Sequence, residues 1–213
     1  MKFYKKEILS KLRNLCDKYN VLLILDEIFT GFGRTAKNFA YEHASIKPDF
    51  ITLAKGLTGG VMPLAATLVS ERIYEGFYSE DANKAFYHGH TMTGNPSACA
   101  AGLASLELYE KEDRLQDVIR LEEKLKEKMS LLKQKYGERM INDRTLGAVC
   151  AFELEGKSDY LNPISKKIKA YSLTQGVMIR PLGNTVYVAP PYTISESSLD
   201  KIFEVVSKII RNI

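Results

Sequence analysis

Residues 22–35 read LLILDEIFTGFGRT, where a run of aliphatic residues meets two adjacent carboxylates and then a turn-rich stretch. A short, continuous apolar run predicts a strand that is buried on both faces, as in a parallel sheet covered by helices. Asp26 then lies at the end of that strand, at the edge of the core. If it is inside, its carboxylate needs a partner, because an unpaired buried carboxylate is too costly to keep ionised. The rest of the sequence has to supply both the sheet and that partner.

The segments around this stretch alternate between helix and strand patterns. Apolar residues at helical spacing predict an amphipathic helix over 5–18. Apolar runs of strand length follow at 21–25, 49–54 and 63–70. Helix followed by a solidly apolar strand, repeated, predicts an α/β fold with a largely parallel sheet.

The second half of the chain is predicted to be α+β. The segment 96–112 begins with Pro96, is rich in alanine and should be a tightly packed helix. Apolar residues spaced between 115 and 136 mark the packing face of a long charged helix. Further strands are expected at 148–156, 177–180 and 185–191, with helices at 163–175 and 196–211. We therefore place a domain boundary near residue 110, which gives domains 1–110 and 111–213.

Composition narrows the class of protein. The chain has 213 residues, 45% hydrophobic and 26% charged, which is ordinary globular material. Its net charge of +4 gives no electrostatic case for binding nucleic acid or an anionic membrane. No apolar run approaches the roughly 20 residues that span a bilayer. Cysteines 16, 99 and 150 are far apart, form no CxxC, and are typical of core residues in a reducing compartment, so a cytoplasmic location is expected.

Lys55 is the second residue with a chemical role to explain. It directly follows the apolar run 49–54 and comes 55 − 26 = 29 positions after Asp26, enough for a crossover to a parallel strand. Both side chains would then lie at the carboxyl ends of strands, where open α/β sheets bind ligands. Such a pair suits pyridoxal phosphate, with the lysine bound to the aldehyde and the carboxylate paired with the protonated pyridine nitrogen. The alternatives are a buried Asp–Lys ion pair or two unrelated rim residues.

Three ordered blocks carry a resemblance to a known family. LDEIFTGFGRT (25–35), KPDFITLAKGLTGG (47–60) and YHGHTMTGNPSACAAG (87–102) resemble the class III aminotransferases of pyridoxal-phosphate fold type I. The segments KGLTGGVMPLAATL (55–68) and VMIRPLGNTVYVAPPY (177–192) are most similar to the branch that aminates 8-amino-7-oxononanoate in biotin biosynthesis. The resemblance implies an α/β fold made of part of a large cofactor domain, residues 1–110, and a small α+β domain, residues 111–213.

The resemblance also assigns roles to cofactor-binding residues. Lys55 matches the lysine that holds pyridoxal phosphate covalently, and Asp26 matches the carboxylate beside its pyridine nitrogen. Thr91 matches a threonine whose hydroxyl binds the cofactor phosphate of the neighbouring subunit. His90 stands in the same HG-x-T segment, where the family usually has proline or a small residue. The resemblance therefore implies that these four residues form the chain's share of a cofactor site.

Substrate-binding residues follow from the same comparison of motifs. Arg180 matches the arginine that holds the substrate carboxylate, a task that suits the two-pronged guanidinium group. Gly89 matches a glycine that lies against the substrate, and Arg34 matches a position tied to substrate binding. No metal is expected, because His88 and His90 have no carboxylate or cysteine cluster beside them.

The resemblance covers the whole chain but only the C-terminal half of the family's length. The loop that takes the cofactor phosphate and the aromatic residue that stacks on the ring belong to the other half. The implied function is transamination of 8-amino-7-oxononanoate to 7,8-diaminononanoate with S-adenosylmethionine as amino donor, as a homodimer or in assembly with a missing N-terminal half. Two alternatives stay open: another class III enzyme acting on an ω-amino acid or ornithine-type substrate, and an inactive fragment of such an enzyme.

Overall fold

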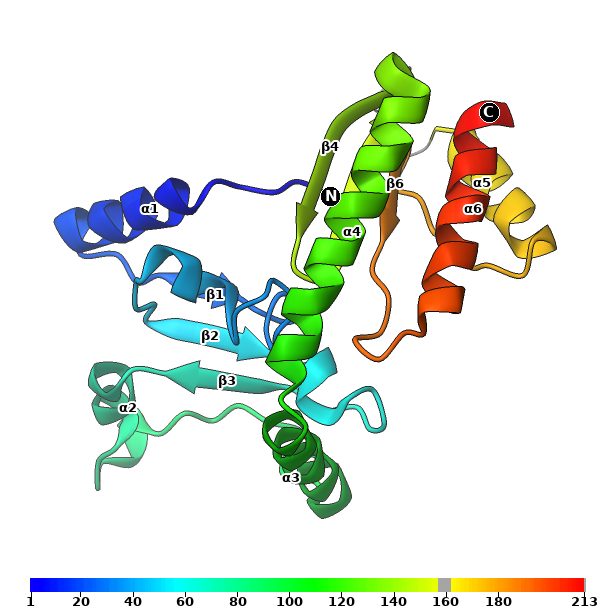
Figure 1. The fold of residues 1–213 in the computed structure, drawn as a ribbon. Coiled ribbons are helices and arrows are strands. Elements are labelled where there is room, and N and C mark those ends of the chain that lie inside the picture. The colour runs from blue at the N-terminus through cyan, green and yellow to red at the C-terminus, as the bar shows by residue number, and fades with distance from the viewer. Residues whose placement is uncertain (157–161, 213) are drawn as a thin grey trace. The chain divides into compact units, whose positions relative to one another are not determined.

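The protein is described by a computed structural model that covers residues 1–156 and 162–212 (Figure 1). The chain divides into two compact units. Residues 4–114 form a unit that we call the sheet unit, and residues 115–213 with residues 1–3 form a C-terminal unit. Each unit has its own three-stranded sheet, so the predicted α/β architecture is confirmed.

The sheet unit is built on the strand order β1-β2-β3, with β1 at Ile24–Asp26, β2 at Phe50–Leu53 and β3 at Ala66–Val69. Strands β1 and β2 are parallel, as predicted, and Asp26 lies opposite Thr52. Strand β3 runs antiparallel to β2. The reason is the short connection between them, which contains only a 3₁₀ turn, whereas a parallel return needs a longer crossover that is usually helical.

Helix α3, Pro96–Lys111, holds the segment that follows β2. The helix begins at the side chain of Asn95, which accepts a hydrogen bond of 3.0 Å from the Ala98 amide. Farther along, the hydroxyl of Ser105 donates to the carbonyl of Gly56 at 3.3 Å. The helix thereby fixes the 3₁₀ turn η2, Lys55–Thr58, at the end of the sheet.

The expectation that 21–25 is a strand buried on both faces is wrong. Strand β1 has only three residues, and Val21, Leu22 and Ile24 are 56%, 44% and 60% exposed. Strand β1 is an outer strand of the sheet, with β2 as its one neighbour in the described chain. Burial of an apolar run depends on neighbours on every side, and those neighbours are not among the described residues.

Two helices of the sheet unit lie at its surface. Helix α1, Lys6–Tyr19, matches the helix predicted over 5–18 but contains no buried residue. Helix α2, Glu71–Phe77, follows β3 and was not predicted. It is short and has no buried residue, so it lacks the periodic pattern by which longer helices are found.

The C-terminal unit contains most of the buried hydrophobic residues. Its antiparallel sheet has the order β4-β5-β6, and helices α4, α5 and α6 complete the unit. The bounds are α4 Arg114–Tyr136, β4 Met140–Leu146, β5 Val149–Leu154, α5 Ile164–Thr174, β6 Thr185–Val188 and α6 Glu196–Asn212.

Three sequence expectations differ from the structure: two in this unit, and one that concerns a cysteine of the sheet unit. Strand β4 was not predicted, because its residues 141–145 are mostly polar or charged and pair along an irregular register. The expected strand at 177–180 does not form, although Val177 and Ile179 are buried and Met178 between them is exposed. Of the cysteines expected in cores, Cys150 is buried and Cys99 is exposed.

Asp49 ties the sheet to its surroundings. Its Oδ2 accepts hydrogen bonds from the Leu23 amide at 2.8 Å and from Nη1 of Arg13 at 2.9 Å. Its Oδ1 accepts from Nη2 of Arg72 at 3.0 Å. The amide of Leu23 and then the Arg13 guanidinium hold the pKa of the Asp49 carboxyl below its usual range. One carboxylate therefore joins the start of β1 to α1 and α2.

We expect Asp49→Asn to lower the free energy of unfolding by about 1–3 kcal/mol, because it weakens hydrogen bonds to charged groups. A carboxyl with a lowered folded pKa stabilises the fold above its unfolded pKa, and this contribution is lost as pH falls through the folded pKa. The difference between wild type and Asp49→Asn in urea unfolding should therefore shrink in acid. The exposed Asp200, paired with Lys128, serves as control, and Asp200→Asn should cost less than about 1 kcal/mol. Equal midpoints for Asp49→Asn and wild type at pH 7 would contradict the role.

Candidate active site

Two neighbouring parallel strands bring Asp26 and Lys55 to one edge of the sheet. Asp26 is the last residue of β1, and Lys55 comes two residues after the end of β2. The amide of Glu27 donates to the carbonyl of Thr52 at 3.0 Å, which keeps the two strands in register up to their ends. Because parallel strands end at the same edge, both residues leave the sheet on the side where α/β proteins bind ligands.

The backbone around Lys55 is tightly constrained. Lys55 has a φ of 39°, in the left-handed region that is uncommon for a residue with a side chain. Gly56 follows, and a Cβ there would come within 2.8 Å of the Cβ of Phe32. Only glycine therefore allows the turn to pack this closely, and the packed turn fixes the point from which the Lys55 side chain leaves the sheet.

The amine of Lys55 lies beside an aromatic ring. Its Nζ is 5.8 Å from the centroid of the Phe29 ring, and Cζ of Arg34 is 5.7 Å from the same centroid. Both distances are within the range of a cation–π contact. The structure therefore places Lys55 and Arg34, two of the predicted site residues, at one phenyl ring.

Asp26 and Lys55 do not form an ion pair. Both side chains are exposed, and Oδ1 of Asp26 accepts a hydrogen bond from the Ile28 amide at 2.9 Å. Within the described chain, no carboxylate lies at ion-pair distance from the Lys55 amine. The alternative of a buried Asp–Lys pair is thereby excluded, and the condition under which Asp26 would need a partner inside the core is not met, because Asp26 is exposed.

The buried carboxylate of this stretch belongs to Glu27, which the sequence analysis did not single out. Glu27 is 2% exposed. Its Oε1 accepts from the Tyr41 amide at 3.0 Å, and its Oε2 accepts from the Thr30 hydroxyl. These bonds close the loop after β1, which carries Phe29 and Arg34. Strand alternation gives a signal for this, since Glu27 has the same parity as the inward residue Leu23.

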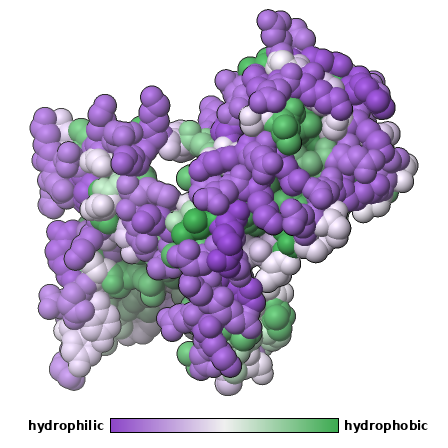
Figure 2. Space-filling view, in the orientation of Figure 1, coloured by the Kyte–Doolittle hydropathy of each residue, from purple (hydrophilic) through white to green (hydrophobic). Residues whose placement is uncertain are grey.

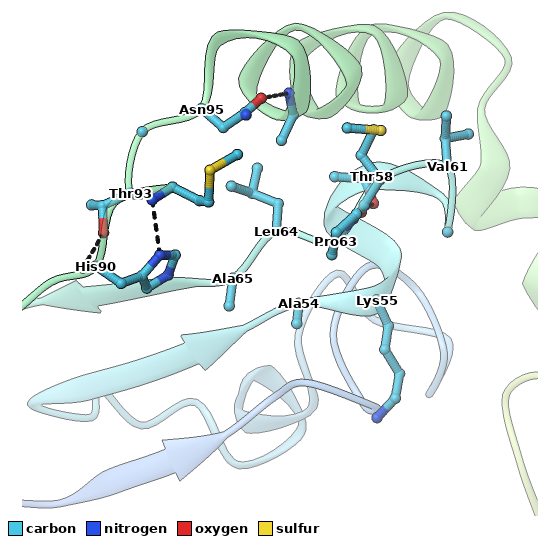
Figure 3. Close-up of a pocket in the computed structure, with 15 residues that line it drawn as sticks. Ala54, Lys55, Thr58, Val61, Pro63, Leu64, Ala65, His90, Thr93 and Asn95 are labelled. Atoms are coloured by element: carbon cyan, nitrogen blue, oxygen red, sulfur yellow. Dashed lines mark hydrogen bonds between the residues drawn. The ribbon is translucent and has the colours of Figure 1, made fainter.

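A groove of about 920 Å³ opens beside Lys55 (Figure 3). Lys55, Thr58, His90, Thr93 and Asn95 are among the residues that line it. The Lys55 side chain points away from His90 and Asn95 in this view. The groove thus places His90, a predicted cofactor-binding residue, in the same concave surface as Lys55.

The segment around His90 is organised by short hydrogen-bonded turns. Nδ1 of His90 accepts from the Met92 amide at 3.1 Å, and the hydroxyl of Thr93 accepts from the His90 amide at 2.9 Å. Gly89 and Thr91, on either side of His90, are exposed. A neutral His90 ring therefore carries its proton on Nε2, while the Thr91 hydroxyl makes no hydrogen bond to another described residue.

Arg180 belongs to the C-terminal unit. It is exposed and follows the buried Ile179, just before the short bridge between Leu182 and Thr185. Among residues 1–156 and 162–212, no group of three or more His, Cys, Asp and Glu side chains could hold a metal ion. No helix in the same residues is long and apolar enough to cross a membrane.

Solved structures show the fold of the chain in longer proteins. An aminotransferase from Bacillus anthracis matches with a TM-score of 0.89 and 28% identity, over 99% of this chain and 49% of that one. A taurine:2-oxoglutarate aminotransferase from Bifidobacterium kashiwanohense, in complex with pyridoxal phosphate and glutamate, matches with a TM-score of 0.87 and 30% identity. That match covers 95% of this chain and 46% of the other. The predicted transaminase fold is therefore confirmed.

Curated relatives and a family model agree with the structures. An adenosylmethionine-8-amino-7-oxononanoate aminotransferase from Helicobacter pylori is 40% identical over 94% of this chain and 46% of its own length. The enzyme of the same name from Synechococcus elongatus is 37% identical over 100% of this chain and 50% of its own length. The chain thus spans about half the length of these relatives. The model of the family "Aminotransferase class-III" matches residues 1–210, and the chain belongs to the class III aminotransferases.

Proposed function

We propose that the chain is the lysine-bearing half of a pyridoxal-phosphate-dependent aminotransferase. One observation carries this proposal: the amine of Lys55 has no ionic partner in the described chain, and Lys55 lies at the sheet edge where β1 ends at Asp26 and helps to line a groove there. An amine that reacts with an aldehyde has to be free of a salt bridge. The relative in complex with pyridoxal phosphate supports the choice of this cofactor.

The residues present fit pyridoxal phosphate in chemical type. Lys55 supplies the amine for the aldehyde, and the unpaired carboxylate of Asp26 suits a protonated pyridine nitrogen. Thr91 supplies an exposed hydroxyl for a phosphate oxygen, and His90 supplies an Nε2 proton in the groove wall. The cofactor, when bound, provides the electron-withdrawing ring on which amino-group transfer depends.

The protein's own residues then have separate tasks. Lys55 would hold the cofactor, and its Nζ would act as general base at the donor carbon that carries the amino group. Asp26 keeps the proton on the ring nitrogen through its negative charge. Arg180 and Arg34 bind substrate carboxylates through paired hydrogen bonds, and Gly89 leaves room for the substrate.

For the substrates, we propose 8-amino-7-oxononanoate as acceptor and S-adenosylmethionine as amino donor, in biotin biosynthesis. The names of the relatives at 37–40% identity support this assignment. The taurine:2-oxoglutarate aminotransferase among the solved structures supports a second candidate for the amino donor, an ω-amino acid. We further propose a cytoplasmic enzyme that works as a homodimer or with an N-terminal half. A screen of amine donors with the acceptor held fixed distinguishes the two substrate classes.

The cofactor assignment is tested by colour and by chemical trapping. Purified chain mixed with pyridoxal phosphate should turn yellow, with visible absorbance near about 420 nm that borohydride removes. Peptide mapping after borohydride should find the cofactor on Lys55 and not on Lys37, which is exposed in the preceding loop. A spectrum unchanged by borohydride, or label spread equally over surface lysines, would contradict the proposal.

A further inference from the structure

We propose that Thr52 is a positioning residue that acts through Asp26. Its hydroxyl donates a hydrogen bond to the Asp26 carboxylate and holds that carboxylate at the end of β1 when the site is filled. The role deepens the proposed function, on which it rests, because it depends on the assignment of Asp26 to the pyridine nitrogen of pyridoxal phosphate. Thr52 was not among the site residues that the sequence analysis singled out.

One polar residue stands in each strand of the sheet unit, and the three lie in one row. The strands read ILD, FITL and ATLV, so Asp26, Thr52 and Thr67 are the only polar residues of these strands. Asp26 lies opposite Thr52, which in turn lies opposite Thr67. Residues paired in this way point to the same face of a sheet. The rest of the three strands is apolar, and Figure 2 shows hydrophobic surface around β3, so the packing of the sheet does not explain this row.

The row lies on the face of the sheet toward which the Lys55 side chain extends. Ala54 lies two positions from Thr52 and so shares its face. Ala65 stands in the same relation to Thr67, and both alanines line the groove. Figure 3 shows the side chains of Ala54, Ala65 and Lys55 pointing to the same side. The polar row is therefore continuous with the candidate active site.

The Thr52 hydroxyl is buried without a partner. Its Oγ1 is closed off from solvent and forms no hydrogen bond with any described residue. Burying a hydroxyl without a hydrogen bond destabilises a fold, because the lost hydration is not replaced. Valine has nearly the shape of threonine and suits a strand as well. Packing alone therefore does not account for a hydroxyl at this position, and a buried unpaired group of this kind calls for a functional explanation.

The Asp26 carboxylate is the acceptor that the row brings beside this hydroxyl. Neighbouring strands lie about 4.8 Å apart, so side chains paired in one row approach each other closely. Oδ1 of Asp26 accepts from the Ile28 amide at 2.9 Å, and among the described residues Oδ2 has no donor. An ionised carboxylate is a stronger acceptor than the exposed Thr67 hydroxyl on the other side. Rotation about χ1 of Thr52 joins its hydroxyl to Oδ2, a contact of the kind that tightens only when a site is occupied.

Two hydrogen bonds to one carboxylate restrict its rotation. With the Ile28 amide on Oδ1 and the Thr52 hydroxyl on Oδ2, the plane of the Asp26 carboxyl group is fixed, whereas one bond alone leaves it free to turn. An ionised carboxylate offers about four lone-pair sites, so acceptor capacity remains for a protonated ring nitrogen. Thr52 therefore acts on the cofactor only through the direction of this charge.

The test titrates the chain with pyridoxal phosphate and follows the visible absorbance near about 420 nm. Thr52→Val should weaken the apparent affinity about tenfold, the size of one hydrogen bond to a charged group. Thr52→Ser keeps the hydroxyl and should bind like wild type. Thr67→Val is the matched control, because it removes the hydroxyl on the side of Thr52 away from Asp26, and its affinity should not change.

A double-mutant cycle shows whether Thr52 acts through Asp26. In the Asp26→Asn background, Thr52→Val should change the affinity by less than about twofold, because the charge that the hydroxyl positions is gone. A second measurement needs no cofactor. Without pyridoxal phosphate, Thr52→Val should unfold at a higher urea concentration than wild type, since it removes an unpaired buried hydroxyl.

Three outcomes would overturn the role of Thr52. Equal affinities of Thr52→Val and wild type would show that the hydroxyl does not serve the site, and additive losses in the cycle would show that it does not act through Asp26. A Thr52→Val chain that unfolds at a lower urea concentration than wild type would make the hydroxyl a structural group. In these cases the wild-type chain is still coloured, whereas a colourless wild type contradicts the proposed function itself, so the two failures are distinguishable.

Discussion

Lys55→Ala is expected to abolish the yellow colour with pyridoxal phosphate and to reduce transamination by at least roughly 10²–10⁴-fold, the contribution of general acid–base catalysis alone. Lys55 is the single lysine among the described residues that line the groove. Its amine has no carboxylate partner in the described chain, and its backbone is fixed by the packing of Gly56 against Phe32. Among the described residues that line the groove, no second amine is present to replace it.

The measurement combines spectra, borohydride trapping and turnover of the chain in assembly with the N-terminal half that we propose above. Lys37→Ala is the matched control, because Lys37 is exposed in the loop after β1, and it should keep both colour and activity. Unfolding by urea should remain similar in the two variants, since neither lysine forms an ion pair in the described chain. A coloured, borohydride-sensitive Lys55→Ala protein would show that another amine holds the cofactor.

The helices show what local pattern is able to predict. The closing helix was expected over 196–211 and is observed at Glu196–Asn212, and the helix expected over 163–175 is observed at Ile164–Thr174. Helical spacing and terminal residues lie within the segment itself, so they can be read without knowing the neighbours. The prediction of a strand at 177–180 was wrong, because a strand forms only beside a partner strand, and the segment's own sequence does not locate that partner.

In the candidate site, too, the sequence predicted where residues lie along the strands but not which side chains are buried by contacts with distant residues. The order of strand, crossover and strand predicted that Asp26 and Lys55 leave the sheet at one edge, and the parallel pairing of β1 and β2 has that geometry. Which of the two carboxylates is buried was not predicted. Burial of Glu27 depends on the Thr30 hydroxyl and the Tyr41 amide folding back over it, and such loop contacts leave only a weak trace in the sequence.

Asp26→Asn is expected to lower turnover by roughly 10²–10³-fold, the size typical of losing one electrostatic group in a preorganised site. An amide of the same shape carries no charge, so it cannot favour the protonated form of the pyridine nitrogen. The fold should be unaffected, because the asparagine oxygen can still accept the hydrogen bond from the Ile28 amide that Oδ1 of Asp26 accepts now.

Asp81→Asn provides a control with the same local geometry. Oδ1 of Asp81 accepts from the Asn83 amide at 3.0 Å, as Oδ1 of Asp26 accepts from the Ile28 amide at 2.9 Å. Both variants should unfold at the wild-type urea concentration, and Asp81→Asn should retain activity. If Asp26→Asn also retains it, the carboxylate at the end of β1 does not act on the cofactor ring. The parallel strand pair would then position Lys55 alone, and the ring nitrogen would have to be served by a group outside this chain.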